Sequence, residues 1–110
     1  MRASPAVAGK EGADVSVSMI SKLRVEDFAR WKKTYDEDGA AIREQGGVIA
    51  HSVHRDLDDP YLVTVYHKFG DEQSARAYAG MLDGDEFRAM AEQTGIDLNS
   101  LEMSLVTDVN

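Results

Sequence analysis

The sequence predicts an α+β fold whose elements follow the order strand, helix, strand, strand, helix, strand. Three observations carry this prediction. Apolar side chains alternate with small polar ones near both ends of the chain, as in strands that bury one face. Between these ends, two segments place apolar residues at steps of three and four, which is the spacing of an amphipathic helix. A β-rich segment with a polar break at its centre, residues 48–69, separates the two helical segments and predicts a hairpin.

The first strand and the first helix follow directly from these patterns. The strand begins near Asp14, where DVSVSMISKLR alternates valine and methionine with serine. A helix is expected over residues 26–45, with an interruption at Gly39 and an end at Gly46-Gly47. Its apolar stripe consists of Phe28, Trp31, Tyr35 and Ile42.

The second helix and the last strand repeat this scheme. Asp71 is the expected N-cap of the helix DEQSARAYAGML, which breaks at Asp83-Gly84 and restarts as DEFRAMAEQ. The last strand, LEMSLVTDV, alternates Leu101 and Met103 with polar neighbours. The resulting order, β-α-β-β-α-β, is that of the ferredoxin-like fold, an antiparallel sheet with both helices on one face.

Parity along the strands sorts their side chains into two faces of this sheet. We expect the face under the helices to contain Val15, Val17, Met19, Ile49, Val53, Val63, Val65, Leu101, Met103 and Leu105. The opposite face is small and mildly polar, and contains Ser16, Ser18, Ala50, Ser52, His54, Thr64, Tyr66, Ser104 and Val106. An uncovered face with so few charges predicts a partner sheet packed over it, and therefore a homodimer that closes into an α+β barrel.

Size and charge narrow the class of protein. The chain has 110 residues, enough for one domain, which we place at residues 14–110 after a disordered tail at residues 1–13. A formal net charge of −8 argues against binding to nucleic acid or to anionic membranes. The chain has no cysteine, which excludes disulfides and thiolate metal sites. No apolar run approaches the roughly 20 residues that span a bilayer, and we expect a cytoplasmic protein.

The hairpin carries all three histidines of the chain. His51 and His67 share the face under the helices, and His54 points to the other side. If Arg55 pairs with Tyr61 across the turn, His51 and His67 are diagonal neighbours roughly 7–8 Å apart. Two imidazoles on an apolar surface can act as general acid and base. The alternatives are two structural histidines, or a metal site completed by one carboxylate, but no metal site is predicted.

Three local patterns resemble one known superfamily. They are VEDFARWKKTYDE at the first helix, GGVIAHSVHRDLDDPYLVTVYHKF at the hairpin and FGDEQSARAYAG at the second helix. Over residues 14–109 the chain resembles the dimeric α+β barrel proteins, in particular those similar to antibiotic-biosynthesis monooxygenases and polyketide cyclases. The resemblance implies a substrate bound in each subunit between helices and sheet. It departs from the monooxygenases at their cavity asparagine, because the asparagines here are Asn99 and Asn110.

The resemblance and the histidines together predict a cofactor-independent tailoring enzyme of secondary metabolism. Its substrate would be a polycyclic, polyketide-like, hydrophobic or aromatic small molecule, and proton abstraction by histidine would start a cyclisation or a monooxygenation. The expected catalytic residues are His51, His67 and Tyr35. The expected substrate-binding residues are Trp31, Phe28, Met19, Val53, Val65, Tyr78 and Met103. The absence of nucleotide-binding glycine motifs agrees with a protein that needs no cofactor. A non-catalytic ligand-binding dimer and a structural or regulatory homodimer remain alternatives.

Overall fold

The computed structural model describes residues 16–109, so the predicted disordered tail at residues 1–13 lies outside the described residues. Eight elements follow one another along this part of the chain. They are β1 (Val17–Val25), α1 (Phe28–Glu37), α2 (Gly39–Gln45), β2 (Val48–Arg55), β3 (Leu62–Phe69), α3 (Glu72–Met81), α4 (Asp85–Thr94) and β4 (Ile96–Thr107).

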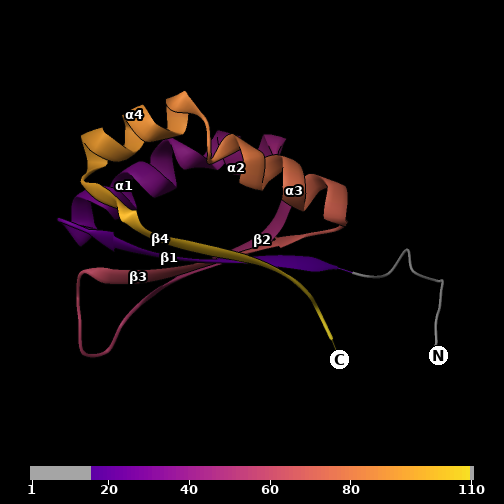
Figure 1. Ribbon diagram of the computed structural model, residues 1–110, viewed down its shortest axis with the longest axis horizontal. Helices are drawn as coiled ribbons and strands as arrows, with labels where there is room; N and C mark the ends of the chain where they lie inside the picture. The colour runs from indigo at the N-terminus through magenta and orange to yellow at the C-terminus, as the bar shows by residue number, and fades with distance from the viewer. Residues whose placement is uncertain (1–15, 110) are drawn as a thin grey trace.

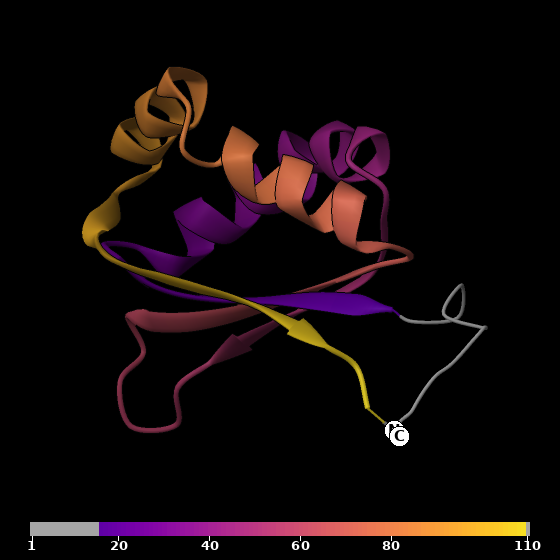
Figure 2. The ribbon, with the colours of Figure 1, turned by 45° about the vertical axis from the view of Figure 1, so that its right-hand side comes forward.

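The four strands form one antiparallel sheet in the order β2-β3-β1-β4. All four helices cover the same face of this sheet, and its other face is open (Figures 1 and 2). Each helical segment expected from the sequence is a pair of consecutive helices, α1 with α2 and α3 with α4. The α+β, ferredoxin-like fold predicted from the sequence is therefore confirmed.

The helix ends explain why the chain breaks where it does. The carboxylates of Asp27 and Asp71 cap α1 and α3 by accepting backbone N–H bonds in the first turn of each helix. Gly95 ends α4 at a φ of 78°, in the left-handed region that glycine adopts without a Cβ clash. Because the chain turns sharply there, β4 starts at Ile96, five residues before the predicted start at Leu101.

Two apolar clusters fill the space between the helices and the sheet. One contains Leu23, Val25, Trp31, Val63, Val65, Ala91 and Ile96. The other contains Val17, Met19, Phe69, Ala75 and Tyr78. The sheet residues among them are mostly at alternate positions of β1 and β3, the two central strands, and this confirms the predicted parity of both strands; the others come from the helices and from the start of β4.

The predicted register of the hairpin is wrong by two residues. Arg55 pairs with Val63 instead of Tyr61, and His51 is directly opposite His67 instead of diagonal to it. The reason is a longer loop, in which the carboxylate of Asp56 accepts N–H bonds from two following residues and keeps them out of the ladder. A shift of two residues preserves parity, so the two histidines stay on one face.

Ile49 was expected under the helices, and this prediction is also wrong. The ladder between β2 and β3 shifts between Val48 and Ala50, which turns the Ile49 side chain to the outside, where 63% of it is exposed. Val48 packs against the second apolar cluster in its place.

The open face of the sheet is more charged than the sequence pattern suggested. The register places Lys22, Lys68 and Glu102 on it, around a centre that includes Ile20 and Tyr66. Within residues 16–109, every helix is too short or too polar to cross a membrane.

Candidate functional site

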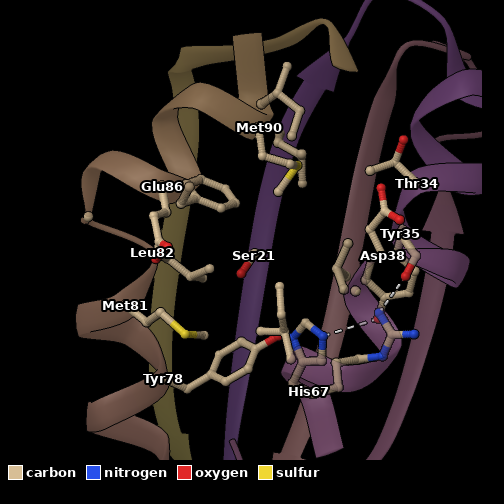
Figure 3. Close-up of a pocket in the computed structure, with 18 of the residues that line it drawn as sticks. Ser21, Thr34, Tyr35, Asp38, His67, Tyr78, Met81, Leu82, Glu86 and Met90 are labelled. Carbon is tan, nitrogen blue, oxygen red and sulfur yellow. Dashed lines mark hydrogen bonds between the residues drawn. The ribbon is translucent and has the colours of Figure 1, made fainter. Parts of the chain in front are cut away.

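A cavity of about 610 Å³ lies between the sheet and the helix layer. In Figure 3, Ser21 and His67 form its floor on the sheet, α3 and α4 close one side, and Thr34 and Tyr35 of α1 close the other. Both apolar clusters contribute to its wall, with Met19, Leu23, Trp31, Val65, Tyr78 and Ile96. A space of this size suits a drug-sized organic molecule.

Tyr35, His51 and His67 form one hydrogen-bonded group beside this cavity. The Tyr35 hydroxyl lies 3.1 Å from Nδ1 of His51 and 3.1 Å from Nε2 of His67. Tyr35 reaches down from α1, whereas the two histidines face each other across β2 and β3, with ring centroids 6.3 Å apart. His67 is buried in the cavity wall, and His51 is exposed on the edge strand. The group therefore connects the cavity with the surface.

The Tyr35 hydroxyl has a single proton, so it can donate to only one of the two histidines and must accept from the other. If Tyr35 donates to His51, the Nε2–H of His67 donates to the Tyr35 oxygen, and Nδ1 of His67 carries a lone pair. If Tyr35 donates to His67 instead, Nδ1 of His67 carries the proton. Nδ1 of His67 is buried and has no hydrogen-bond partner in the described part of the chain. In either tautomer this nitrogen is available to a ligand that reaches it.

Burial and one nearby cation set the protonation states. Burial, followed by the charge of Arg43 and the proximity of His51, lowers the pKa of His67 to about 4. Loss of hydration and Arg43 also lower the pKa of His51. Burial raises the pKa of Tyr35 to about 12, although Arg43 opposes this shift. At neutral pH the site thus combines two neutral imidazoles with a neutral phenol.

Arg43 is the functional candidate that sequence reasoning missed. It comes from α2, lines the cavity, and only 7% of it is exposed. Its guanidinium lies over the Tyr35 ring, 4.0 Å from the centroid, and Nη1 donates to the Tyr35 carbonyl at 2.8 Å. Trp31 stacks on the Tyr35 ring, with centroids 5.2 Å apart. Helical spacing gave no signal for Arg43, because an arginine on a short helix is normally exposed.

Ser21 is a second residue that the sequence did not single out. It lies on β1 in the cavity floor, and its hydroxyl is buried without a hydrogen-bond partner among residues 16–109. Together with Nδ1 of His67, it gives the apolar cavity two buried polar atoms that lack partners. Such atoms are costly in a folded protein and are typical of places where a ligand or water completes the bonding.

The predicted site residues divide into two sets. Those that line the cavity are His67, Tyr35, Trp31, Met19, Val65 and Tyr78. Those placed elsewhere are His51, which bonds to Tyr35 from the surface side, and Phe28, Val53 and Met103, which pack against the two apolar clusters. Over the described residues, no three His, Asp or Glu side chains come close enough to hold a metal ion.

Comparisons with known proteins bear on the fold of this chain. No protein-family model matches the chain, and no curated protein matches its sequence. Solved structures do match. SnoaB from Streptomyces nogalater, described as a cofactor-independent oxygenase, is 18% identical with a TM-score of 0.66, over 86% of this chain and 94% of that one.

Two further structures share the fold. The monooxygenase ActVA-Orf6 from Streptomyces coelicolor, solved with the ligand nanaomycin D, is 17% identical with a TM-score of 0.62, over 88% of this chain and 90% of that one. A dimeric ferredoxin-like protein from an uncultured marine organism is 9% identical with a TM-score of 0.60, over 91% and 93% of the two chains. At these identities the likeness shows a shared fold, and it confirms the resemblance that the sequence suggested at that level.

Proposed function

We propose that this protein is a cofactor-independent tailoring enzyme that removes a proton from a polycyclic, polyketide-like molecule and oxidises it with O₂. One observation carries the proposal. A buried, neutral histidine, His67, lies in the wall of an apolar cavity and is connected through Tyr35 to a surface histidine, His51. The names of SnoaB and ActVA-Orf6 support the reaction class, since both have this fold.

The chemistry needs a base and a dry cavity. Loss of a proton from a phenol or a 1,3-dicarbonyl leaves an enolate, whose carbon reacts with O₂ to form a C–O bond and a hydroperoxide. Loss of water from the hydroperoxide then leaves a new carbonyl. A CH₂ group and O₂ thus become a C=O group and water, and the substrate supplies all the electrons that O₂ takes up. In the cyclase alternative, the enolate carbon attacks an internal carbonyl, and the proton returns to the resulting alkoxide.

His67 is the proposed base, and Nδ1 is the atom that takes the proton. With Nε2–H of His67 donating to Tyr35 and Tyr35 donating to His51, protonation of Nδ1 moves one proton along each bond. The last proton arrives at His51, which is exposed to water. A low pKa keeps His67 unprotonated at neutral pH, so that it can act as the base. Because the transfer through Tyr35 moves the positive charge to His51, no imidazolium remains buried next to Arg43.

The aromatic and sulfur-containing side chains of the cavity suit a flat substrate. Trp31 and Tyr78 offer ring faces and edges, and Met19 adapts to irregular shapes. Nδ1 of His67 is closed off from solvent in this structure, and the ring of Tyr78 lies beside it, with centroids 5.4 Å apart. A substrate therefore has to displace the side chains over this nitrogen before it reacts.

The same proposal includes a homodimer through the open face of the sheet. Ile20 on the central strand β1 and Val106 on the edge strand β4 leave more than a third of their surface exposed on this face, and Ser52 and Tyr66 are paired neighbours on it. A second sheet would cover these side chains, and one structure with this fold is described as dimeric.

Oxygen uptake tests the proposed reaction directly. The protein is mixed with a panel of hydroxyanthrones, including 1,8-dihydroxyanthrone, in metal-free and flavin-free buffer under ¹⁸O₂. We expect O₂ uptake above the protein-free rate and a quinone that contains one ¹⁸O atom. Tyr35→Phe, which interrupts the connection to His51, should slow this uptake. A rate that never exceeds the protein-free control would reject the oxygenase proposal, and ring closure without O₂ uptake would favour the cyclase.

A further inference from the structure

Arg43 carries a positive charge that the described part of the protein does not neutralise. The side chain is buried in the cavity wall, and none of the ion pairs within residues 16–109 includes it. A guanidinium stays protonated at any physiological pH, so the charge cannot be lost as a buried lysine's can. Keeping an unpaired charge out of water is costly unless something in the functional state compensates it.

The position of Arg43 is fixed by its neighbours. The Tyr35 ring supports one face of the guanidinium, and the Tyr35 carbonyl accepts one of its N–H bonds. Gly39 leaves the space for it, because a Cβ at this position would lie 2.7 Å from Nη1. The guanidinium has five N–H donors, and this carbonyl is its single hydrogen-bond partner in the described part of the chain. The remaining donors are therefore free for a ligand in the cavity.

The acidic residues around the cavity do not replace such a ligand. Asp38, Asp85 and Glu86 also line it, but all three are exposed, and none is paired with Arg43. Exposed carboxylates remain hydrated and are screened by salt, so they interact weakly with a buried cation. The cavity thus has acidic side chains that reach solvent and one buried cation next to Tyr35 and His67.

We infer that Arg43 binds an oxyanion of the ligand, either a carboxylate or an ionised enol on a planar ring system. The guanidinium fork matches two oxygens in one plane, and a charge-assisted bond of this kind is strong in a water-poor cavity. The inference rests on the proposed function, because it assigns the substrate of the same cavity to the class of organic anions. Binding at Arg43 would place the acidic part of the ring system close to the Tyr35–His67 pair.

Two matched pairs of ligands test the inference on the unmodified protein. The first pair is 2-naphthoate and 2-naphthamide, which differ in charge at a carboxyl group. The second is 2-hydroxy-1,4-naphthoquinone, an ionised enol at neutral pH, and its neutral 2-methoxy analogue. Trp31 is the single tryptophan of the chain and lines the cavity, so quenching of its fluorescence reports binding. We expect the anion of at least one pair to bind roughly 10–100-fold more tightly than its neutral partner, as a charged hydrogen bond implies.

Substitutions then assign the preference to Arg43. Arg43→Gln should abolish the preference for the anion, because the anion loses far more affinity than its neutral partner does. Arg43→Lys should retain part of the preference, because the charge stays while the fork is lost. Arg88→Gln removes the same charge from the exposed surface of α4, outside the cavity, and should keep the full preference.

The outcomes separate this inference from the proposed function. Equal affinities within both pairs, a preference that survives Arg43→Gln, or no binding of any of the four ligands would overturn the inference. If neutral and anionic ligands bind equally well and O₂ uptake on hydroxyanthrones is also observed, the inference is overturned and the proposed function stands. A charge preference that depends on Arg43, without turnover of any hydroxyanthrone, would support the inference and reject the oxygenase.

Discussion

The buried polar side chains on the two faces of the sheet differ in whether they have hydrogen-bond partners. On the open face, Ser18 is 1% exposed, yet its hydroxyl donates to Asp108 at 2.5 Å and lies 2.8 Å from the Tyr66 hydroxyl. Since the Ser18 proton goes to the carboxylate, Tyr66 donates to Ser18, and every member of the group has a partner. On the covered face, the Ser21 hydroxyl and Nδ1 of His67 are also buried, and neither has a hydrogen-bond partner within residues 16–109.

The difference separates a structural network from a candidate active site. Paired polar groups on the open face hold the end of β4 against β1, where Asp108 also accepts a bond from Ser16. The unpaired polar groups on the covered face lie at a cavity, and α2 adds to its wall Arg43, a cation without a counterion among residues 16–109. A folded protein tolerates such groups where a ligand completes them, and the comparison therefore predicts loss of stability on one face and loss of function on the other.

The largest effect is expected from the histidines of the covered face. His67→Ala and His51→Ala should each lower the turnover of a hydroxyanthrone by roughly 10²–10⁴-fold, the usual effect of a lost acid or base, with far-UV circular dichroism unchanged. His54→Ala is the matched control. This histidine projects to the open face and bonds to Ser52, so its loss should leave turnover intact. If both variants of the covered face retain near-normal activity, these histidines are structural.

The next effect concerns the proposed dimer. Ser52→Glu places a charge on the open face, on the edge strand β2 beside Tyr66. A charge that a second sheet removes from water without a counter-charge costs several kcal/mol, which corresponds to weaker association by roughly 100-fold or more. Light scattering should show a wild-type dimer and a monomeric variant. Ala89→Glu, an exposed position on α4, should remain dimeric, and a monomeric wild type would reject the interface.

A smaller effect is expected in the pH dependence of stability. The pKa of His67 is lowered from 6.5 to about 4, so between these pH values the unfolded chain binds a proton at His67 that the folded protein does not bind. The free energy of unfolding should therefore decrease as the pH falls through this window, by about 3 kcal/mol at most. Burial raises the pKa of Tyr35 to about 12 and also raises that of Tyr78, so neither tyrosine titrates in this window, and His51, whose pKa is lowered, contributes with the same sign.

Urea denaturation between pH 7 and pH 4 measures this dependence. His67→Gln lacks the titrating group, and its stability should fall less than that of the wild type over the same range. Parallel curves for the two proteins would show that His67 keeps an ordinary pKa in the fold.

The smallest effects come from paired serine substitutions. Ser18→Ala removes a hydroxyl with two partners and should destabilise the protein by about 1–2 kcal/mol without changing turnover. Ser21→Ala removes a buried hydroxyl without a partner and should leave stability unchanged or slightly higher. Thermal unfolding of the two variants measures both effects, and a larger loss of stability for Ser21→Ala than for Ser18→Ala would contradict the contrast between the faces.

The sequence predicted the fold well because its signals are periodic. Alternation in β1, β3 and β4 depends only on which side chains are buried, and parity survived the two-residue error in the hairpin register. That is why His51 and His67 could be paired before the structure was known. The bulge at Ile49 could not be predicted, because the run Val48-Ile49-Ala50 supports either register equally well.

The candidate site was predicted only in part. Trp31 and Tyr35 followed from helical spacing, which identifies apolar stripes. Arg43 did not, because an arginine on a short helix is normally exposed, and the break at Asp38 hid its alignment with Tyr35. Its burial depends on the room that Gly39 leaves and on the ring beneath it, and both are properties of three-dimensional packing.

Nitrogen-detected NMR of the three imidazole rings tests the central claim most directly, because it reports the protonation and the ligand contacts of each ring together. At pH 5.5 we expect His67 to be neutral because its pKa is lowered to about 4, and we expect a bound hydroxyanthrone to shift the signals of His67 and His51 but not those of His54. A protonated His67 at this pH, or a ligand that leaves its nitrogens unchanged, would contradict a proton-handling site on the covered face.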